Sequence, residues 1–306
     1  MRRLLLFLTV VAVFAACSQS YEEKRRTVRK ERQQRLREDS VALKVAVLPT
    51  IDCLPVFVAK TEHLFSGQNV DVRLKLFTAQ MDCDTALAGG SVEGAVTDLV
   101  RAERLAKQGT SLRYVAATGA YWQLYSNRMA RITKLPQVDD KMIGMTRYSA
   151  TALLADLAVD SAKLKPERVF KIQVNDVNIR LKMLIGGEID AVWLTEPQAS
   201  QARQARHHLL MDSREVDVRL GVVAFREKAL KDSARQRQLE VFCKGYNQAV
   251  DSLNRYGVSR YRDLMVKYCN VRADQIDSVL QAMKFQRMEA PREADIERAR
   301  KWLEKQ

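Results

Sequence analysis

The chain has 306 residues, 47% of them hydrophobic and 29% charged, and its formal net charge at pH 7 is +14. This apolar content is enough for a packed core and excludes an intrinsically disordered protein. The length allows one large domain or two smaller ones. No dense basic block interleaved with aromatic residues occurs in the sequence, so the charge does not indicate a protein that binds RNA or DNA.

The first 16 residues have the features of an export signal. Arg2 and Arg3 precede an apolar run that is too short to cross a bilayer as a helix. The run ends in Phe-Ala-Ala directly before Cys17, which resembles the lipobox of bacterial lipoproteins. We therefore predict a signal peptide over residues 1–16 and lipidation of Cys17. A plain signal peptide followed by a chance cysteine is the alternative.

Residues 17–42 form a charged segment with little to bury. Residues 20–40 contain only Val28 and Leu36 as aliphatic side chains, so no apolar stripe can support a packed face. Glu and Arg residues can stabilise a transient helix there. We predict a linker that holds the globular part away from a membrane, with its basic charge near anionic lipid.

From residue 43 onward, short apolar runs alternate with amphipathic ones. The predicted strands are 43–49, 70–77, 93–98, 112–119, 141–146, 170–174, 189–194, 208–212 and 219–226. The predicted helices between them are 54–65, 82–89, 99–108, 149–160, 176–187 and 197–205. Strands that alternate with helices of about ten residues indicate mainly parallel sheets in an α/β fold.

Two segments of this pattern are near copies of each other. Residues 87–100 read LAGGSVEGAVTDLV, and residues 184–197 read LIGGEIDAVWLTEP. Each predicts a helix that stops at a pair of glycines and is followed by a buried strand. The repeat indicates a protein built from two similar halves.

The chain changes character after Arg226. One face of a long predicted helix carries Leu239, Phe242, Tyr246, Ala249, Leu253 and Tyr256 at steps of three and four residues. More helices follow, up to Trp302 and Leu303. We expect these helices to pack on the first half.

The chain from about Leu43 to Tyr256 resembles type II periplasmic solute-binding proteins of ABC importers. The branch it resembles binds sulfonates, nitrate and thiamine pyrimidine precursors. The residues that carry the resemblance are 45–60, 64–77, 86–98, 143–158 and 184–197, in the order that the family has.

The resemblance implies an α/β fold of two lobes that close on a ligand, the Venus-flytrap arrangement, with extra C-terminal helices. The first lobe would comprise residues 43–122 and 222–306, and the second lobe residues 123–221. Two crossing strands, near residues 120–127 and 218–225, would join the lobes.

Ligands of open α/β sheets bind beyond the carboxyl ends of the strands. Candidate ligand-binding residues at those ends and at the hinge are Asp52, Cys53, Asp82, Cys83, Thr97, Asp98, Trp122, Arg147, Tyr148, Ser149, Trp193 and Glu196. Asp82 and Ser149 have the alternative role of helix caps, Trp193 that of a core residue, and Trp122 that of a brace for the hinge. Carboxylates at the cleft would repel anions, so Asp52, Asp98 and Glu196 favour a polar organic ligand with nitrogen donors.

The cysteines leave several alternatives open. Export permits disulfides between Cys53 and Cys83 and between Cys243 and Cys269. A metal cluster of thiolates and carboxylates around Cys53 and Cys83 is a further alternative. No histidine stands at ligand spacing, so neither a metal nor a cofactor is predicted.

We predict a lipid-anchored, monomeric solute receptor in the cell envelope that passes a small molecule to an ABC permease. An enzyme on the same frame, for pyrimidine-precursor synthesis or chorismate-type dehydration, is the alternative. No nucleophile–His–acid pattern supports an enzyme, and export does not suit those reactions. A ligand sensor or scaffold component of the envelope is the third reading.

Overall fold

The structure is a computed structural model that describes residues 21, 23–34, 37–66, 70–276 and 278–306. The predicted signal peptide and Cys17 lie outside the described residues. The chain divides after Ala42 into two units. In the first unit, residues 23–34 and 37–41 are helical with almost entirely exposed side chains. Among all described residues, no helix combines the length and apolar character that spanning a bilayer requires.

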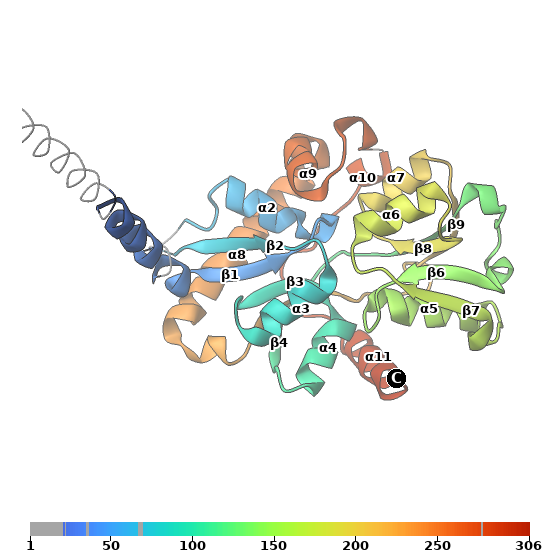
Figure 1. Cartoon of the computed structure of the whole chain (residues 1–306), viewed down its shortest axis with the longest axis horizontal. Coiled ribbons are helices and arrows are strands. Elements are labelled where there is room, and N and C mark those ends of the chain that lie inside the picture. Colours follow the sequence, from blue (N-terminus) through green and yellow to red (C-terminus); the bar gives the residue numbers. More distant parts are fainter. Residues whose placement is uncertain (1–20, 22, 35–36, 67–69, 277) are drawn as a thin grey trace, which may run out of the picture. The chain divides into compact units, whose positions relative to one another are not determined.

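The second unit contains two five-stranded sheets (Figure 1). The first sheet has the order β2-β1-β3-β10-β4 and the second the order β7-β6-β8-β5-β9. The strands of the first are β1 (Leu43–Val47), β2 (Val72–Leu76), β3 (Gly94–Asp98), β4 (Leu112–Ala117) and β10 (Gly221–Arg226). Those of the second are β5 (Gln123–Ser126), β6 (Lys141–Met145), β7 (Val169–Gln173), β8 (Ala191–Leu194) and β9 (His208–Asp212). The prediction of an α/β fold with two lobes is confirmed.

Each sheet is mixed, because one strand runs against the other four. In the first sheet this strand is β10, which pairs antiparallel with β3 and β4. In the second sheet it is β5, which pairs antiparallel with β8 and β9. Both strands arrive from the opposite sheet: the chain crosses from β4 to β5 and returns from β9 to β10. We call the first sheet with its helices the first lobe, and the second sheet with its helices the second lobe.

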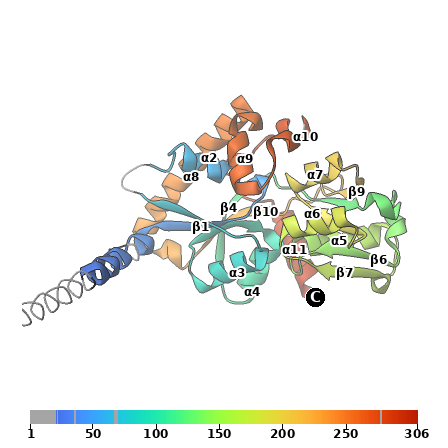
Figure 2. The ribbon, with the colours of Figure 1, turned by 45° about the horizontal axis from the view of Figure 1, so that its top comes forward.

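Helices cover both faces of each sheet (Figures 1 and 2). On one face of the first sheet, Val45 and Val47 pack toward α2 (Leu54–Thr61), α8 (Ser233–Tyr256) and α9 (Arg262–Cys269). On the other face, Ala46 packs toward α3 (Gln80–Gly89) and α4 (Leu99–Lys107). On the second sheet, Trp193 packs toward α5 (Ala150–Ser161), and Val192 packs toward α6 (Val177–Gly186) and α7 (Gln198–Gln204). Alternate residues of a strand point to opposite faces, so both faces are apolar.

Short helical segments complete the fold. They are η1 (Ile51–Cys53), η2 (Arg128–Ala130), η3 (Leu135–Val138), η4 (Pro166–Arg168), η5 (Ala229–Lys231), η6 (Val258–Tyr261), η7 (Ala273–Gln275) and α10 (Ser278–Gln281). Of these, η1 matters for the site, because it follows the carboxyl end of β1.

The two copied segments occupy equivalent places in the two sheets. Helices α3 and α6 both end at a glycine with positive φ, Gly90 at 75° and Gly187 at 78°, a conformation that favours glycine. The strands that follow pair in the same register, with Val45 opposite Gly94 in the first sheet and Ile143 opposite Ala191 in the second. The repeat in the sequence is therefore a repeat in the fold.

The last helix, α11 (Glu293–Glu304), contacts both lobes. Arg300 Nε donates to Glu103 Oε2 of α4 at 2.8 Å, and Trp302 Nε1 donates to Asp156 Oδ2 of α5 at 2.8 Å. The expectation that the C-terminal helices pack on the first half holds for α8 and α9. Helix α11 also packs on the first lobe, at α4, and in addition it contacts α5 of the second lobe.

Candidate functional site

The carboxyl ends of the strands of the two lobes face each other along a line that we call the seam. The end of β1 meets the end of β8, where the Ile51 N–H donates to the Glu196 carbonyl at 2.9 Å. Gln198, the first residue of α7, donates from Nε2 to the Pro49 carbonyl at 3.0 Å. These contacts hold the middle of the seam closed.

A second contact joins the end of β3 to the start of α5, which follows β6. Asp98 Oδ1 accepts from the N–H groups of Arg101 and Ala150, each at 3.0 Å. One carboxylate of the first lobe thus caps its own helix α4 and also the first turn of α5 in the second lobe. Burial raises the pKa of Asp98 to about 7, although Arg101 acts in the opposite direction.

A third contact joins the segments that follow β2 and β7. Ala79 and Asp176 form an isolated antiparallel bridge. Asn175 Nδ2 and Gln173 Nε2 both lie 3.2 Å from Met81 Sδ. Three strands of each lobe therefore meet a partner of the other lobe at their ends: β1 meets β8, β3 meets β6, and β2 meets β7. This is the pattern expected when two similar halves face each other about an approximate two-fold axis.

Glu196 is fully buried, and its carboxylate is satisfied by the protein itself. Oε1 accepts from the Tyr121 hydroxyl and from Arg203 Nη2, each at 3.0 Å. Oε2 accepts from the N–H and the hydroxyl of Ser200 at 2.9 and 2.7 Å. Since the carboxylates of both Glu196 and Asp98 already accept protein hydrogen bonds, they give no reason to expect a ligand rich in nitrogen donors.

Two arginines, one from each lobe, are buried beside the seam, and each is only 2% exposed. Arg101 of the first lobe forms an ion pair with Asp84, with Nη2 2.6 Å from Oδ2, and also donates to the Gln80 carbonyl. Arg180 of the second lobe has no hydrogen-bond partner for Nε or Nη1 among the described residues. Burial lowers the pKa of Arg180 to about 10, Asp176 opposes this shift, and Arg101 adds to it.

Other buried polar atoms at the seam also lack a protein partner among the described residues. They are Gln80 Oε1, Thr195 Oγ1 and Gln198 Oε1. Buried polar groups are nearly always hydrogen-bonded in proteins, so groups without a partner that gather at the carboxyl ends of strands indicate where a polar ligand contacts the protein.

The structure brings only part of the predicted set to the seam. Asp98 and Glu196 lie there, with Thr97 one residue before the end of β3. Ser149 accepts from the Thr151 N–H at 3.2 Å and is the N-cap of α5, as its alternative reading had it. Asp52 follows β1 in η1, where burial raises its pKa.

The remaining predicted residues lie in the core, at the hinge or at the margins of the seam. Trp193 is fully buried in the core of the second lobe, and Trp122 is 6% exposed in the same cluster at the hinge. Asp82 is exposed in the first turn of α3. Arg147 and Tyr148 line a cavity of about 560 Å³ between α5, β7 and α11, and the guanidinium carbon of Arg104 lies 4.3 Å from the Tyr148 ring centre.

The structure contains neither of the disulfides that the sequence left open, because Cys53, Cys83, Cys243 and Cys269 are free thiols. Cys53 packs with Val45 on one face of the first sheet, and Cys83 packs with Ala46 on the other. The sheet therefore separates these two thiols, which also rules out a shared metal cluster. In the part of the chain that the structure describes, no group of three or more His, Cys, Asp or Glu side chains is placed to hold a metal ion.

The Cys243 and Cys269 thiols face different neighbours. Cys269 Sγ lies 3.8 Å from the Thr50 carbonyl near the seam. Cys243, on α8, is close enough to Arg113 of β4 for that guanidinium to lower its pKa, although burial raises it to about 11 overall.

Sequence reasoning did not find Arg101 and Arg180. Both stand on the apolar face of a helix: Arg180 is followed by Leu181 and, one turn on, by Leu184, and both leucines are buried. A charged residue at a core position is rare without a partner. That signal is present in the sequence and would have identified both positions.

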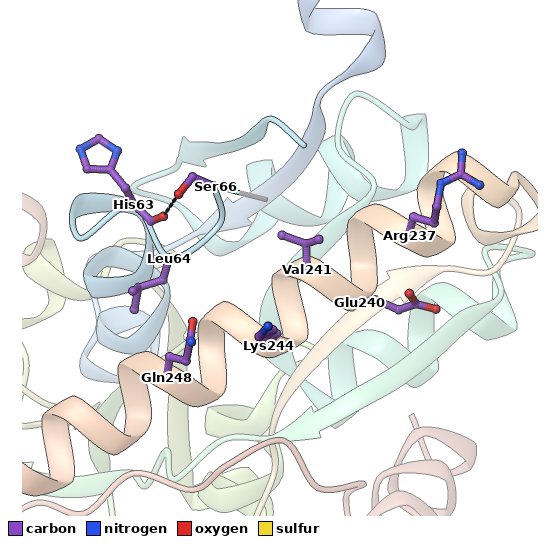
Figure 3. A pocket seen from close by; sticks show the side chains of 8 residues that line it. All are labelled: His63, Leu64, Ser66, Arg237, Glu240, Val241, Lys244 and Gln248. Carbon is purple, nitrogen blue, oxygen red and sulfur yellow. Dashed lines mark hydrogen bonds between the residues drawn. The ribbon is translucent and has the colours of Figure 1, made fainter. Parts of the chain in front are cut away.

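A surface cavity of about 510 Å³ lies away from the seam, between the turn that contains His63, Leu64 and Ser66 and one face of α8 (Figure 3). The side chains of α8 that line it are Arg237, Glu240, Val241, Lys244 and Gln248. Charges of both signs border it, so it does not indicate a ligand of one charge.

Two five-stranded sheets with one exchanged strand each, joined by two crossings and facing each other through strand ends, define the type II periplasmic solute-binding fold. Three solved structures share it at 11–19% identity. The ligand-binding component of an ABC-type import system from Staphylococcus aureus has a TM-score of 0.71 and 18% identity, over 86% of this chain and 91% of that chain.

The periplasmic aliphatic sulphonate binding protein SsuA from Escherichia coli has a TM-score of 0.69 and 19% identity, over 86% and 87% of the two chains. The periplasmic nitrate-binding protein NrtA from Synechocystis PCC 6803 has a TM-score of 0.67 and 11% identity, over 81% and 73%. A comparison with curated proteins gives no match. The sequence profile described as NMT1/THI5 like matches residues 50–254, and the chain therefore belongs to the NMT1/THI5-like family.

Proposed function

We propose that this protein is a lipid-anchored solute receptor that captures a small polar organic molecule between its lobes and delivers it to an ABC importer. The observation that carries the proposal is the seam, where the strand ends of both lobes converge on buried polar atoms that have no partner among the residues described by the structure. Family membership and the binding functions of the similar solved structures support the same function.

The mechanism follows from the two crossings between the lobes. Rotation about the segments between Ala117 and Gln123 and between Asp212 and Gly221 separates the strand ends and opens the seam to solvent. A ligand that contacts both lobes binds the closed form more tightly and shifts the equilibrium toward it. The permease then recognises the outer surfaces of the closed lobes. Lipid on Cys17 keeps a monomeric receptor at the envelope membrane.

Native mass spectrometry of the full chain, purified in detergent from its own host, tests this proposal. We expect a complex heavier than the protein by one small molecule, which is released intact on denaturation. The protein mass should lack residues 1–16 and include a lipid on Cys17. A protein that carries no small molecule would contradict the receptor function, and a retained molecule that the protein converts to product would indicate an enzyme.

A further inference from the structure

The second lobe contains a buried guanidinium that lacks hydrogen-bond acceptors for two of its nitrogens in the described part of the chain. Arg180 stands in the first turns of α6, is 2% exposed, and has no partner for Nε or Nη1 among the described residues. A desolvated guanidinium whose N–H groups lack acceptors opposes folding and closure. A fold keeps such a group when something else supplies the missing acceptors.

The acidic side chains nearby do not supply those acceptors. Asp176, one turn before Arg180, uses Oδ1 to accept from the N–H groups of Asn178 and Ile179 as the N-cap of α6. Asp84 of the first lobe pairs with Arg101 at 2.6 Å. Arg101 itself lies close enough to Arg180 to lower its pKa. Two guanidinium groups from opposite lobes therefore stand near each other, with one carboxylate paired to one of them.

A second set of polar groups lies at the middle of the seam. Asn178 Oδ1 accepts from Gln198 Nε2 at 2.9 Å, and the same Nε2 donates to the Pro49 carbonyl of the first lobe at 3.0 Å. Gln198 Oε1 and Thr195 Oγ1 are buried without partners among the described residues. Neutral polar groups thus connect α6 with the end of β8, at the same seam beside which Arg180 is buried.

We propose that Arg180 receives an oxyanion group of the ligand, a carboxylate, sulfonate or phosphate, with Arg101 of the opposite lobe as the second positive charge. This inference rests on the proposed function and names the chemical class of the ligand. Guanidinium groups bind such oxygens through two parallel hydrogen bonds. Gln198 and Thr195 then face the rest of the molecule.

The other position suited to an anion is already filled. The first N–H groups of a helix attract anions, and α5 begins at the seam, but its Ala150 N–H donates to Asp98 Oδ1. A carboxylate of the protein takes that position. The anion therefore binds on the α6 side, which orients the ligand along the seam.

Arg180 also couples binding to closure. With the lobes apart, water solvates its guanidinium, and closure without an anion buries the charge unpaired. Closure around an oxyanion pairs the same charge. The anion therefore favours the closed form over the open form through this one side chain, which is the differential contact that a ligand-driven closure requires.

Anion-dependent thermal unfolding tests the inference. The full chain in detergent, after removal of retained ligand by reversible unfolding, is titrated with methanesulfonate, acetate or inorganic phosphate against sodium chloride of equal ionic strength. We expect at least one oxyanion to raise the melting temperature of the wild type by several degrees. Arg180→Gln should lose this shift. Arg237→Gln, an exposed change on α8 with the same loss of charge, should keep it.

An equal shift in wild type and Arg180→Gln would overturn the inference, because the anion would then bind adventitiously elsewhere. No shift with any of the three anions in the wild type would overturn it too. The two proposals fail differently. A neutral or cationic molecule found by native mass spectrometry leaves the receptor function intact and refutes the oxyanion site, whereas the absence of any retained molecule together with no anion shift refutes both.

Discussion

The first and second lobes share one strand order, one helix–glycine–strand repeat and one mode of crossing, yet they treat a buried arginine differently. In the first lobe, Arg101 has a carboxylate partner at 2.6 Å. In the second lobe, Arg180 is equally buried and two of its nitrogens have no partner in the described part of the chain. The comparison teaches that the first lobe pairs its buried arginine with its own carboxylate, whereas the second lobe leaves Arg180 available for the oxyanion that we propose.

The largest expected effect separates the two arginines directly. Arg101→Met leaves Asp84 buried without its counter-charge, and we expect the free energy of unfolding to fall by about 3–5 kcal/mol. Arg180→Met removes an unpaired buried charge, and we expect the ligand-free protein to become more stable by about 1 kcal/mol or more. Urea unfolding of both variants measures this. Equal destabilisation by the two substitutions would break the comparison and make Arg180 a structural residue.

A pH series sharpens the comparison at Asp98, the carboxylate of the first lobe that reaches α5 of the second. Its pKa of about 7 in the folded protein, raised by burial and by Asp84 against the effect of Arg101, lies above its unfolded value of about 3.9. The folded state therefore binds the proton more tightly. The contribution of protonated Asp98 to the free energy of unfolding is therefore fully present below about pH 4 and is lost as pH rises through about 7.

We expect this loss to reach up to about 4 kcal/mol, at about 1.4 kcal/mol for each pH unit between the two pKa values. Asp98→Asn keeps the acceptor oxygen for the Arg101 and Ala150 N–H groups but does not titrate. The variant should therefore lose less stability than the wild type between pH 4 and pH 8 in urea unfolding. Parallel curves for the two proteins would show that Asp98 titrates normally.

The smallest effect concerns the attachment of α11 to each lobe. Trp302→Phe keeps the ring packing but removes the Nε1 hydrogen bond to Asp156 of the second lobe. We expect a loss of about 1 kcal/mol in unfolding free energy. Arg300→Met, which removes the bond to Glu103 of the first lobe, is the matched variant. A loss above about 3 kcal/mol for Trp302→Phe would mean that α11 is a major part of the second lobe's core.

The helices and strands could be predicted because apolar residues recur at regular spacing and glycines mark the ends of helices. The helix that ends at Gly187 was expected over residues 176–187 and is observed as Val177–Gly186. The end of the helix could be predicted because a glycine, here Gly187, readily adopts the positive φ found there. The strand that follows could be predicted because four apolar residues are consecutive in Ala191–Leu194. The repeat at residues 87–100 added a second, independent reading of the same unit.

The candidate site was less readable, because contacts between lobes depend on residues far apart in sequence. Asp98 stood at a strand end, but nothing local shows that its carboxylate meets Ala150, 52 residues later. Glu196 was predicted at a strand end and lies at the seam. Its carboxylate, however, already accepts hydrogen bonds from Tyr121 and Arg203. Trp193 was ambiguous for a physical reason, since an aromatic ring serves a core and a stacking site equally well.

The attachment of the last helix to both α4 and α5 has a consequence for solute entry. Together with the two crossings, this helix connects the two lobes on the side of β3 and β10. We therefore expect the lobes to separate most at the opposite edge, at β2 and β7. On this basis we expect solute to enter where Asn175 Nδ2 contacts Met81 Sδ. We expect a solute that enters there to pass α6, the helix that carries Arg180.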